Sequence, residues 1–413
     1  MNSISLRGKL SWQTVTVFLI GMSTRILLGI IQTTKGLHSA TGALNYLSGI
    51  GWFGDFNVYY VTQIHSLLAG EIPYLGFGYW SMPGFVYLLS AGFLLGGYLG
   101  AGAIIFLSDG LTGVVIYKIA RQHAKSDRTA LAAALIYLML PIVMVSEGYL
   151  WLDMQPMLLF MMLSIYYLYT DRPLLSGLLM GVAVLMKQEA LAVLLVALLY
   201  MVASYNWAEL KKFTLGSFSL IGIVAVPFLI IAQGNFIDAI TFLSFLPAAP
   251  IVTPIQQSSN FTTFNALCSV GINGGIMSAS GPASCLSKIP NLGMLQFETI
   301  ISLVYAPIAM ALVVFVGSLL VFFSKKYAIP LGITSSYVII SVLALMTFHN
   351  LYGYYLVPVY ALLLASVYDR ADLLILTPLL VLSTFLGPSD LLFITLLTFV
   401  ALIVRRISLK THV

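Results

Sequence analysis

The sequence predicts an all-α protein, a polytopic transmembrane helical bundle of about 12–13 spans that forms a single domain over residues 1–413. Only 8% of the residues are charged, whereas soluble domains carry about a quarter, and 60% are hydrophobic. Uncharged stretches of 37 and 42 residues, at 72–108 and 327–368, far exceed the roughly 20 residues that one span needs. These features exclude a soluble domain and make the lipid bilayer the expected surroundings. The net charge of +5 follows from loop placement and indicates no nucleic-acid partner.

Thirteen apolar runs supply the candidate helices, and loop charges orient them because cytoplasmic loops attract Lys and Arg. In chain order the runs are 10–33, 83–98, 102–120, 129–146, 155–170, 174–186, 188–204, 214–232, 299–323, 328–348, 351–367, 371–386 and 389–404. The first is too long for the core of a signal peptide, so we expect it to be retained. Run 83–98 has 16 residues with four glycines. We expect it to be re-entrant or interfacial, since a crossing there would place the basic loop 118–128 outside.

The later runs are bounded by basic loops or by short polar turns. The pair 174–186 and 188–204 is short for two spans, and a tilted hairpin is the alternative; Gly177 and Gly181 form a GxxxG pattern that favours close helix packing. Basic pairs follow the runs 299–323 and 389–404. With 83–98 not crossing, both termini are cytoplasmic and 15 of the 19 basic residues lie on that side. We therefore expect an integral protein of the cell membrane, or of the endoplasmic reticulum membrane in a eukaryote.

Two large loops are expected on the extracytoplasmic side, at 34–101 and 233–298. The second loop carries a glycosylation sequon at Asn260, which suits that face. It also carries Cys268 and Cys285, which form a disulfide in an oxidising compartment or otherwise remain thiols.

The first loop contains a candidate interfacial helix over residues 55–69. Apolar and aromatic residues, Phe56 and Tyr60 among them, recur at helical spacing on one face, whereas Asp55 and Tyr59 lie on another. Such a helix next to a span would lie along the membrane surface. Asp55 would stand at its N-terminus, where it either serves chemistry or only caps the helix.

A second acidic segment follows the run 129–146 and holds Glu147, Trp151 and Asp153. Two carboxylates at one face suit general-base catalysis or binding of a divalent cation. The alternative is an interfacial aromatic belt with solvated acids.

Candidate cations lie near the same boundaries. Lys187 is at the outer tip of the 174–204 hairpin, and His349 precedes the run 351–367. Either of them could instead be solvated. Arg25 and Asp109 lie within runs, where charges are costly, so Arg25 either binds a phosphate or forms a structural ion pair with Asp109.

Several of these segments together resemble the integral-membrane GT-C glycosyltransferases, in particular the mannose-type and arabinose-type enzymes that use a polyprenyl-phosphate sugar. The similarity lies in Gly54-Asp55 with Tyr59-Tyr60, in the segments 68–74 and 83–85, and in later short motifs. Those motifs are Pro141 followed by 147–153, the segment 177–187, and His349 with Tyr352 and Pro358. Two departures stand out: Tyr79 to Pro83 replaces a double proline, and the Trp-Trp-Asp-Tyr-Gly signature of oligosaccharyltransferases is missing.

The resemblance implies an enzyme that moves one sugar from a polyprenyl (dolichyl) phosphate donor to a glycan, lipid or protein acceptor outside the cytoplasm, usually with inversion. It implies Asp55 as the catalytic base, with Asp153 and its neighbour Glu147 as further acids. A divalent cation, Mg or Mn, would be held by Asp55 and Asp153 if the enzyme uses one. The expected contacts to substrate and lipid phosphate are Lys187, His349, Arg25, Tyr59, Tyr60, Glu71 and Tyr352. A multi-span transporter or lipid flippase is the alternative function, although the acids gather at outer ends and no repeat is evident.

Overall fold

The structure is a computed structural model that describes residues 11–33, 55–79, 81–203, 207–241 and 357–383, together with 398, 401, 402 and 405. Within these residues the fold is helical, and an isolated bridge between Pro73 and Phe77 is the one β-type pairing. The prediction of an all-α protein is confirmed. The second large loop from 242 onward lies outside the described residues, with Asn260, Cys268 and Cys285.

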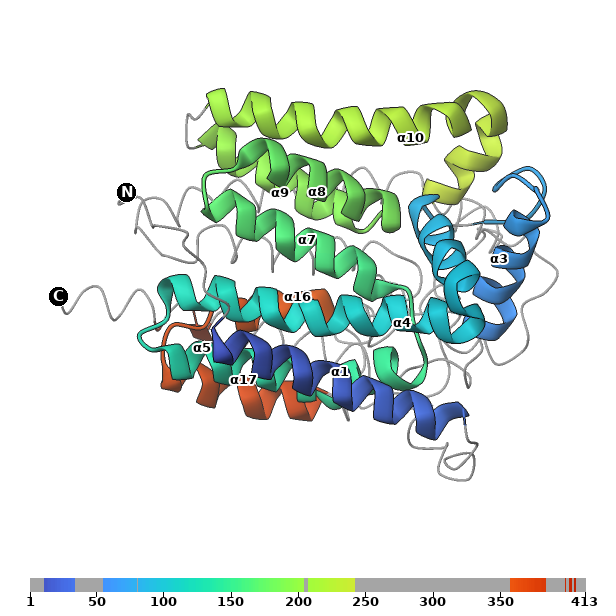
Figure 1. Ribbon diagram of the computed structural model, residues 1–413. Coiled ribbons are helices and arrows are strands. Elements are labelled where there is room, and N and C mark those ends of the chain that lie inside the picture. The colour runs from blue at the N-terminus through green and yellow to red at the C-terminus, as the bar shows by residue number, and fades with distance from the viewer. Residues whose placement is uncertain are drawn as a thin grey trace, which may run out of the picture.

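The helices run side by side and form a bundle, and α3 and η2 lie at one end of it (Figure 1). Their bounds are α1 Trp12–Thr33, η2 Asp55–Tyr60, α3 Val61–Leu68, α4 Gly84–His123, α5 Asp127–Met139, α6 Pro141–Val143, η3 Met144–Tyr149, α7 Met154–Tyr169, α8 Pro173–Met186, α9 Ala190–Ala203, α10 Trp207–Thr241, α16 Val357–Ala365 and α17 Arg370–Ser383; η2 and η3 are π-helices. Among the described helices, α1, α4 and α10 are long and apolar enough to cross a membrane, and α5 with its bent continuation makes a fourth. The total of 12–13 spans includes undescribed segments and stays a prediction.

Helix α4 covers two of the predicted runs, 83–98 and 102–120, but its backbone breaks between them at Gly96 and Gly97. Gly97 has φ +60°, a left-handed conformation that glycine adopts freely. A Cβ on Gly100 would lie only 2.1 Å from the carbonyl oxygen of Gly92, so the two arms approach closely because neither residue has a side chain. The part of α4 before Gly96 contacts α3 at the end of the bundle (Figure 1). Such a break is what a re-entrant or interfacial segment needs, and that assignment stays a prediction.

The run 129–146 is not one straight helix. It bends by 49° between Met139 and Pro141 and continues as η3. Pro141 lacks a backbone N–H and its ring excludes the preceding turn from regular helix, which accounts for the bend. The hydrophobic pattern of an apolar run does not indicate a bend of this kind. Its consequence is that the residues after Pro141 leave the axis of α5 and turn toward α1.

Small residues set the packing of the second half of the bundle. A Cβ on Gly177 of α8 would lie 2.1 Å from the carbonyl oxygen of Phe213 in α10, and one on Gly181 would lie 2.9 Å from that of Ser217. Both glycines of the GxxxG pattern therefore face α10, as close helix packing requires. Helix α10 also extends beyond the predicted 214–232 through a break at Gln233, which has φ +37°.

Candidate active site

One end of the bundle brings together η2, the start of α4, the turn before α7 and the turn between α8 and α9. The ring of Phe56 in η2 packs edge-on against Trp151, with centroids 4.9 Å apart. Tyr60, at the end of η2, packs in the same way on Phe85 of α4, at 5.1 Å. These contacts fix the backbone segment that begins with Asp55 against the turn that carries Asp153.

Trp151 is the anchor of this end. Its side chain is 2% exposed and lies between Phe56 and Phe106, and its indole N–H donates to the carbonyl oxygen of Gly148 at 3.2 Å. Gly102 of α4 makes room for it, because a Cβ there would lie 2.7 Å from the ring. The backbone of Trp151 has φ +56°, a conformation that costs a bulky residue about 1–3 kcal/mol and that is typical of constrained functional segments. Burial excludes the interfacial aromatic belt as the reason for this tryptophan.

Lys187 lies between two carboxylates. Its Nζ atom is 2.8 Å from Oδ1 of Asp153 and 3.5 Å from Oε1 of Glu189. The Lys187 side chain is 6% exposed, so the alternative of a solvated lysine is excluded. The cluster of Asp153, Lys187 and Glu189 is an ion triad at the same end of the bundle as η2.

Local structure explains why these three residues meet. Helix α8 ends at Met186, and Lys187 leaves it in an extended conformation. A Cβ on Gly84 would lie 2.6 Å from the carbonyl oxygen of Leu185, so the start of α4 approaches the end of α8 because Gly84 has no side chain. Ser81 then donates to Oε1 of Gln188 at 3.2 Å. Asp153 directly precedes α7, where the dipole of the helix favours a carboxylate.

Burial raises the pKa values of two side chains at this end, Glu189 and Tyr79. Burial raises the pKa of the Glu189 carboxyl; the charge of Lys187 lowers it in part, and that of Asp153 adds to the rise. Burial and the negative charge of Asp153 also raise the pKa of the Tyr79 hydroxyl, which donates to the carbonyl oxygen of Met82 at 3.2 Å. Neither Glu189 nor Tyr79 is among the predicted site residues. The signal that could have found Glu189 is its position two residues after Lys187.

Asp55 is the first residue of η2 and directly precedes Phe56. Its role as catalytic base stays a prediction. The fold brings the segment of Asp55 close to that of Asp153, because η2 packs on Trp151, two residues before Asp153.

Arg25 does not join the ion triad. Its side chain is fully buried, its Nε donates to Oδ2 of Asp109, and its Nη1 donates to the carbonyl oxygen of Leu138 at 2.6 Å. Asp109 also accepts a hydrogen bond from the hydroxyl of Tyr137 at 2.9 Å, and Tyr137 accepts one from Gln155 at 3.0 Å. Of the two alternatives for Arg25, the geometry favours the structural ion pair.

Glu147 is separated from Asp153 by the turn around Trp151. It is fully buried in η3, and neither carboxylate oxygen has a hydrogen-bond partner among the described residues. Glu147 is therefore an interior acid rather than a solvated partner of Asp153.

The remaining predicted contacts are more scattered. Tyr59 is half-buried, Tyr60 is buried on Phe85, and Glu71 is exposed in the loop after α3. His349 and Tyr352 lie outside the described residues. In the part of the chain that the structure describes, no three His, Cys, Asp or Glu side chains are grouped so that they could hold a metal ion.

One family model matches part of the chain. Residues 81–231, somewhat over a third of the chain, match the family model of the dolichyl-phosphate-mannose-protein mannosyltransferases, which is a GT-C family. The predicted GT-C resemblance is confirmed. The matched segment contains Glu147, Asp153 and Lys187, and it begins shortly after the segment of Asp55. The match supports a membrane glycosyltransferase. No curated protein and no solved structure matches the chain.

Proposed function

We propose that this protein transfers a single sugar, mannose in the first instance, from a polyprenyl (dolichyl) phosphate donor to an extracytoplasmic acceptor. The donor and the sugar are those that the description of the matching family names, and that description also names protein as the acceptor. The observation that carries the proposal is the ion triad: a buried lysine between Asp153 and Glu189, at the end of the bundle where η2 packs.

The proposed reaction is a single displacement at the anomeric carbon. The acceptor hydroxyl oxygen bonds to that carbon and its proton passes to Asp55. The bond from the carbon to the phosphate oxygen breaks, and its electron pair leaves with the polyprenyl phosphate. The configuration at the anomeric carbon is inverted because the acceptor attacks the face opposite the leaving group. A phosphate leaves readily, so a carboxylate on the acceptor side is the main requirement.

Lys187 supplies the positive charge that the leaving phosphate needs, because charge-assisted hydrogen bonds to phosphate oxygens strengthen as negative charge develops. A phosphate that binds at the triad brings a further negative charge beside the carboxylates of Asp153 and Glu189. Glu189, whose pKa is raised by burial, can take up a proton and so keep the cluster close to neutral. Asp153 holds the ammonium in place at 2.8 Å.

The test is transfer by the purified protein in nanodiscs, supplied with polyprenyl-phosphate mannose and an acceptor peptide. We expect Asp55→Asn to lose activity by at least about 100-fold, because a general base contributes roughly that much or more. Asp127→Asn is the matched control: Asp127 starts α5, and its exposed side chain pairs with Arg121 at 3.2 Å. Donor binding should persist in both variants.

Full activity of Asp55→Asn would overturn the role of Asp55 in the proposal. Movement of the donor across the bilayer without formation of product would instead favour the alternative of a transporter or flippase.

A further inference from the structure

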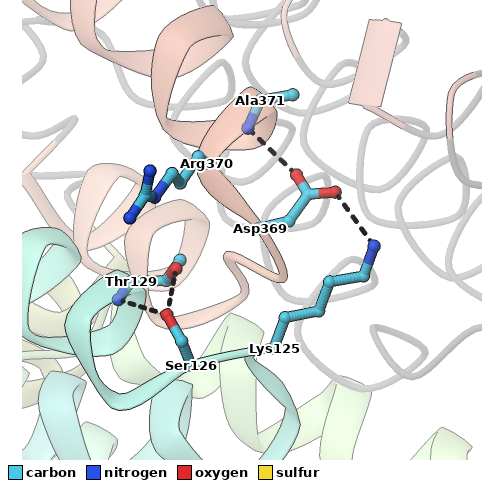
Figure 2. A pocket seen from close by; sticks show the side chains of 6 residues that line it. All are labelled: Lys125, Ser126, Thr129, Asp369, Arg370 and Ala371. Carbon is cyan, nitrogen blue, oxygen red and sulfur yellow. Dashed lines mark hydrogen bonds and ion pairs between the residues drawn. The ribbon is translucent and has the colours of Figure 1, made fainter.

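The basic residues of the described chain gather at the bundle end opposite the ion triad. Of its 11 Lys and Arg residues, nine lie at or near the α4–α5, α7–α8, α9–α10 and α16–α17 connections, and the exceptions are Arg25 and Lys187. In Figure 1 these connections lie at the left, and α3 lies at the right. A pocket of about 400 Å³ opens between the α4–α5 and α16–α17 connections. Its lining is Lys125, Ser126, Thr129, Asp369, Arg370 and Ala371 (Figure 2).

The acid in this pocket, Asp369, is engaged by Arg405. Nη2 of Arg405 lies 2.7 Å and 2.9 Å from the two oxygens of Asp369, and Arg405 also pairs with Asp372. Burial alone would raise the pKa of Asp369, but the hydrogen bonds from Arg405 hold it below the ordinary value. The backbone N–H of Ala371 donates to the same carboxylate at 3.1 Å. Asp369 is therefore a fixed element of the wall.

The two cations of the pocket, Lys125 and Arg370, are held more loosely than Arg405. Nζ of Lys125 lies 3.8 Å from Asp369 and 5.1 Å from the ring centre of Tyr368, and the side chain is 57% exposed. Arg370 is exposed and has no ion pair among the residues that the structure describes. In Figure 2 its guanidinium lies on the side of Ser126 and Thr129, where α5 begins. The lining therefore includes an ammonium, a guanidinium and the hydroxyls of Ser126 and Thr129, which bond to each other at 2.9 Å.

We propose that this pocket binds the phosphate group of an anionic phospholipid headgroup. Arg370 can donate two parallel N–H bonds to phosphate oxygens, and Lys125 adds a point charge. Basic pockets between transmembrane helices are typical sites for such headgroups. The pocket lies at the helix ends, where a bilayer surface would be; an exposed Trp207 and the Lys118–Tyr166 contact of 5.7 Å, both typical of the interface, mark the same end.

The site is distinct from the one proposed for the donor. It lies at the opposite end of the bundle from Lys187, and among the described residues that line it the carboxylate, Asp369, is engaged by Arg405. We therefore expect it to hold lipid as a stable ligand rather than to turn it over.

The test uses the full chain in nanodiscs of phosphatidylcholine with or without phosphatidylglycerol, and native mass spectrometry to count the lipid that stays bound. We expect wild type to retain phosphatidylglycerol over phosphatidylcholine, and the double variant Lys125→Gln/Arg370→Gln to lose that preference by roughly tenfold or more. The control, Lys211→Gln/Lys212→Gln, removes two exposed charges near the start of α10 and should bind like wild type. Arg370→Lys, a milder change, should fall between.

Three outcomes would overturn the proposal. One is a wild type that binds both lipids equally. Another is a control variant that loses as much lipid as the pocket variant, which would indicate a general charge effect. The third is displacement of the lipid by millimolar inorganic phosphate, which would make a soluble phosphate the ligand. If the double variant does not fold, the comparison of wild type with Arg370→Lys decides.

Discussion

Lys187 is the buried cation of the proposed active site. It satisfies two carboxylates that have little access to water, since Asp153 is 14% exposed and Glu189 is 7% exposed. Removal of one partner from such a cluster leaves uncompensated charge, which is more costly than the cluster itself is stabilising. The lysine is therefore structural and, in our proposal, catalytic as well.

We predict that Lys187→Met lowers the free energy of unfolding by about 3 kcal/mol and reduces transfer by at least about 100-fold. The triple variant Lys187→Met/Asp153→Asn/Glu189→Gln should recover most of the stability, because no unpaired charge is left, but none of the activity. Thermal unfolding in detergent and the transfer assay separate the two effects. Recovery of activity in the triple variant would contradict a catalytic role for the lysine.

Glu189 should make stability depend on pH. Its pKa is raised in the folded state, so the folded protein holds a proton that the unfolded chain releases above the ordinary value of 4.5. The protein therefore loses stability as the pH rises from about 4.5 through the folded pKa. We predict that Glu189→Gln flattens this fall, as measured by unfolding temperature against pH. Identical pH profiles for Glu189→Gln and wild type would contradict the assignment.

At the scale of helices, the site depends on a helix end, a bend and a close approach between two helices. Helix α8 ends at Met186, α5 bends before Pro141, and the start of α4 reaches the α8 carboxyl end only because Gly84 has no side chain. The end of α8 places Lys187 in the turn before α9, where it pairs with Asp153. The positive φ of Trp151 belongs to the same group of features.

We predict that Gly84→Ala destabilises the protein by about 1–3 kcal/mol and lowers transfer, because the new Cβ would lie 2.6 Å from the carbonyl oxygen of Leu185 and displace the end of α8. Gly222→Ala in α10 is the control: no atom lies within 4 Å of the position of its Cβ, and alanine favours a helix. Unfolding temperatures measure both changes. A Gly84→Ala protein as stable and active as wild type would show that this approach does not position Lys187.

Helix bounds follow from sequence where polar residues or proline limit an apolar run. The predicted 155–170 and 174–186 correspond to Met154–Tyr169 and Pro173–Met186 within one residue. The bend at Pro141 and the breaks in α4 and α10 depend on backbone geometry that hydrophobic periodicity does not report. The separation of Glu147 from Asp153 depends on the turn at Trp151, so spacing alone placed both in one acidic segment. The sequence left two roles open for Arg25, because a charge inside an apolar run is costly and either pairs with another charge or serves function. The structure shows the pair with Asp109.

At the scale of the whole molecule, charge divides the bundle between its two ends. The acids at 71, 153 and 189 lie at the end with η2 and α3, and most described basic residues lie at the other (Figure 1). This division is what the distribution of Lys and Arg between cytoplasmic and outer loops predicts for a protein whose acidic end faces outward.

Labelling of single cysteines tests this orientation. In a protein whose Cys268 and Cys285 are replaced by serine, we predict that Glu71→Cys reacts with an impermeant maleimide added to intact cells. Lys211→Cys, which is exposed at the opposite end, should react only after the membrane is opened. The reverse pattern would place the ion triad on the cytoplasmic side and contradict transfer to an extracytoplasmic acceptor.

A structure of the protein with a non-hydrolysable polyprenyl-phosphate mannose analogue in a nanodisc tests the proposed active site. We predict that the phosphate lies within hydrogen-bonding distance of Lys187 and that the anomeric carbon is turned toward the segment that begins at Asp55. A phosphate bound away from Lys187, with Asp55 remote from the sugar, would contradict it.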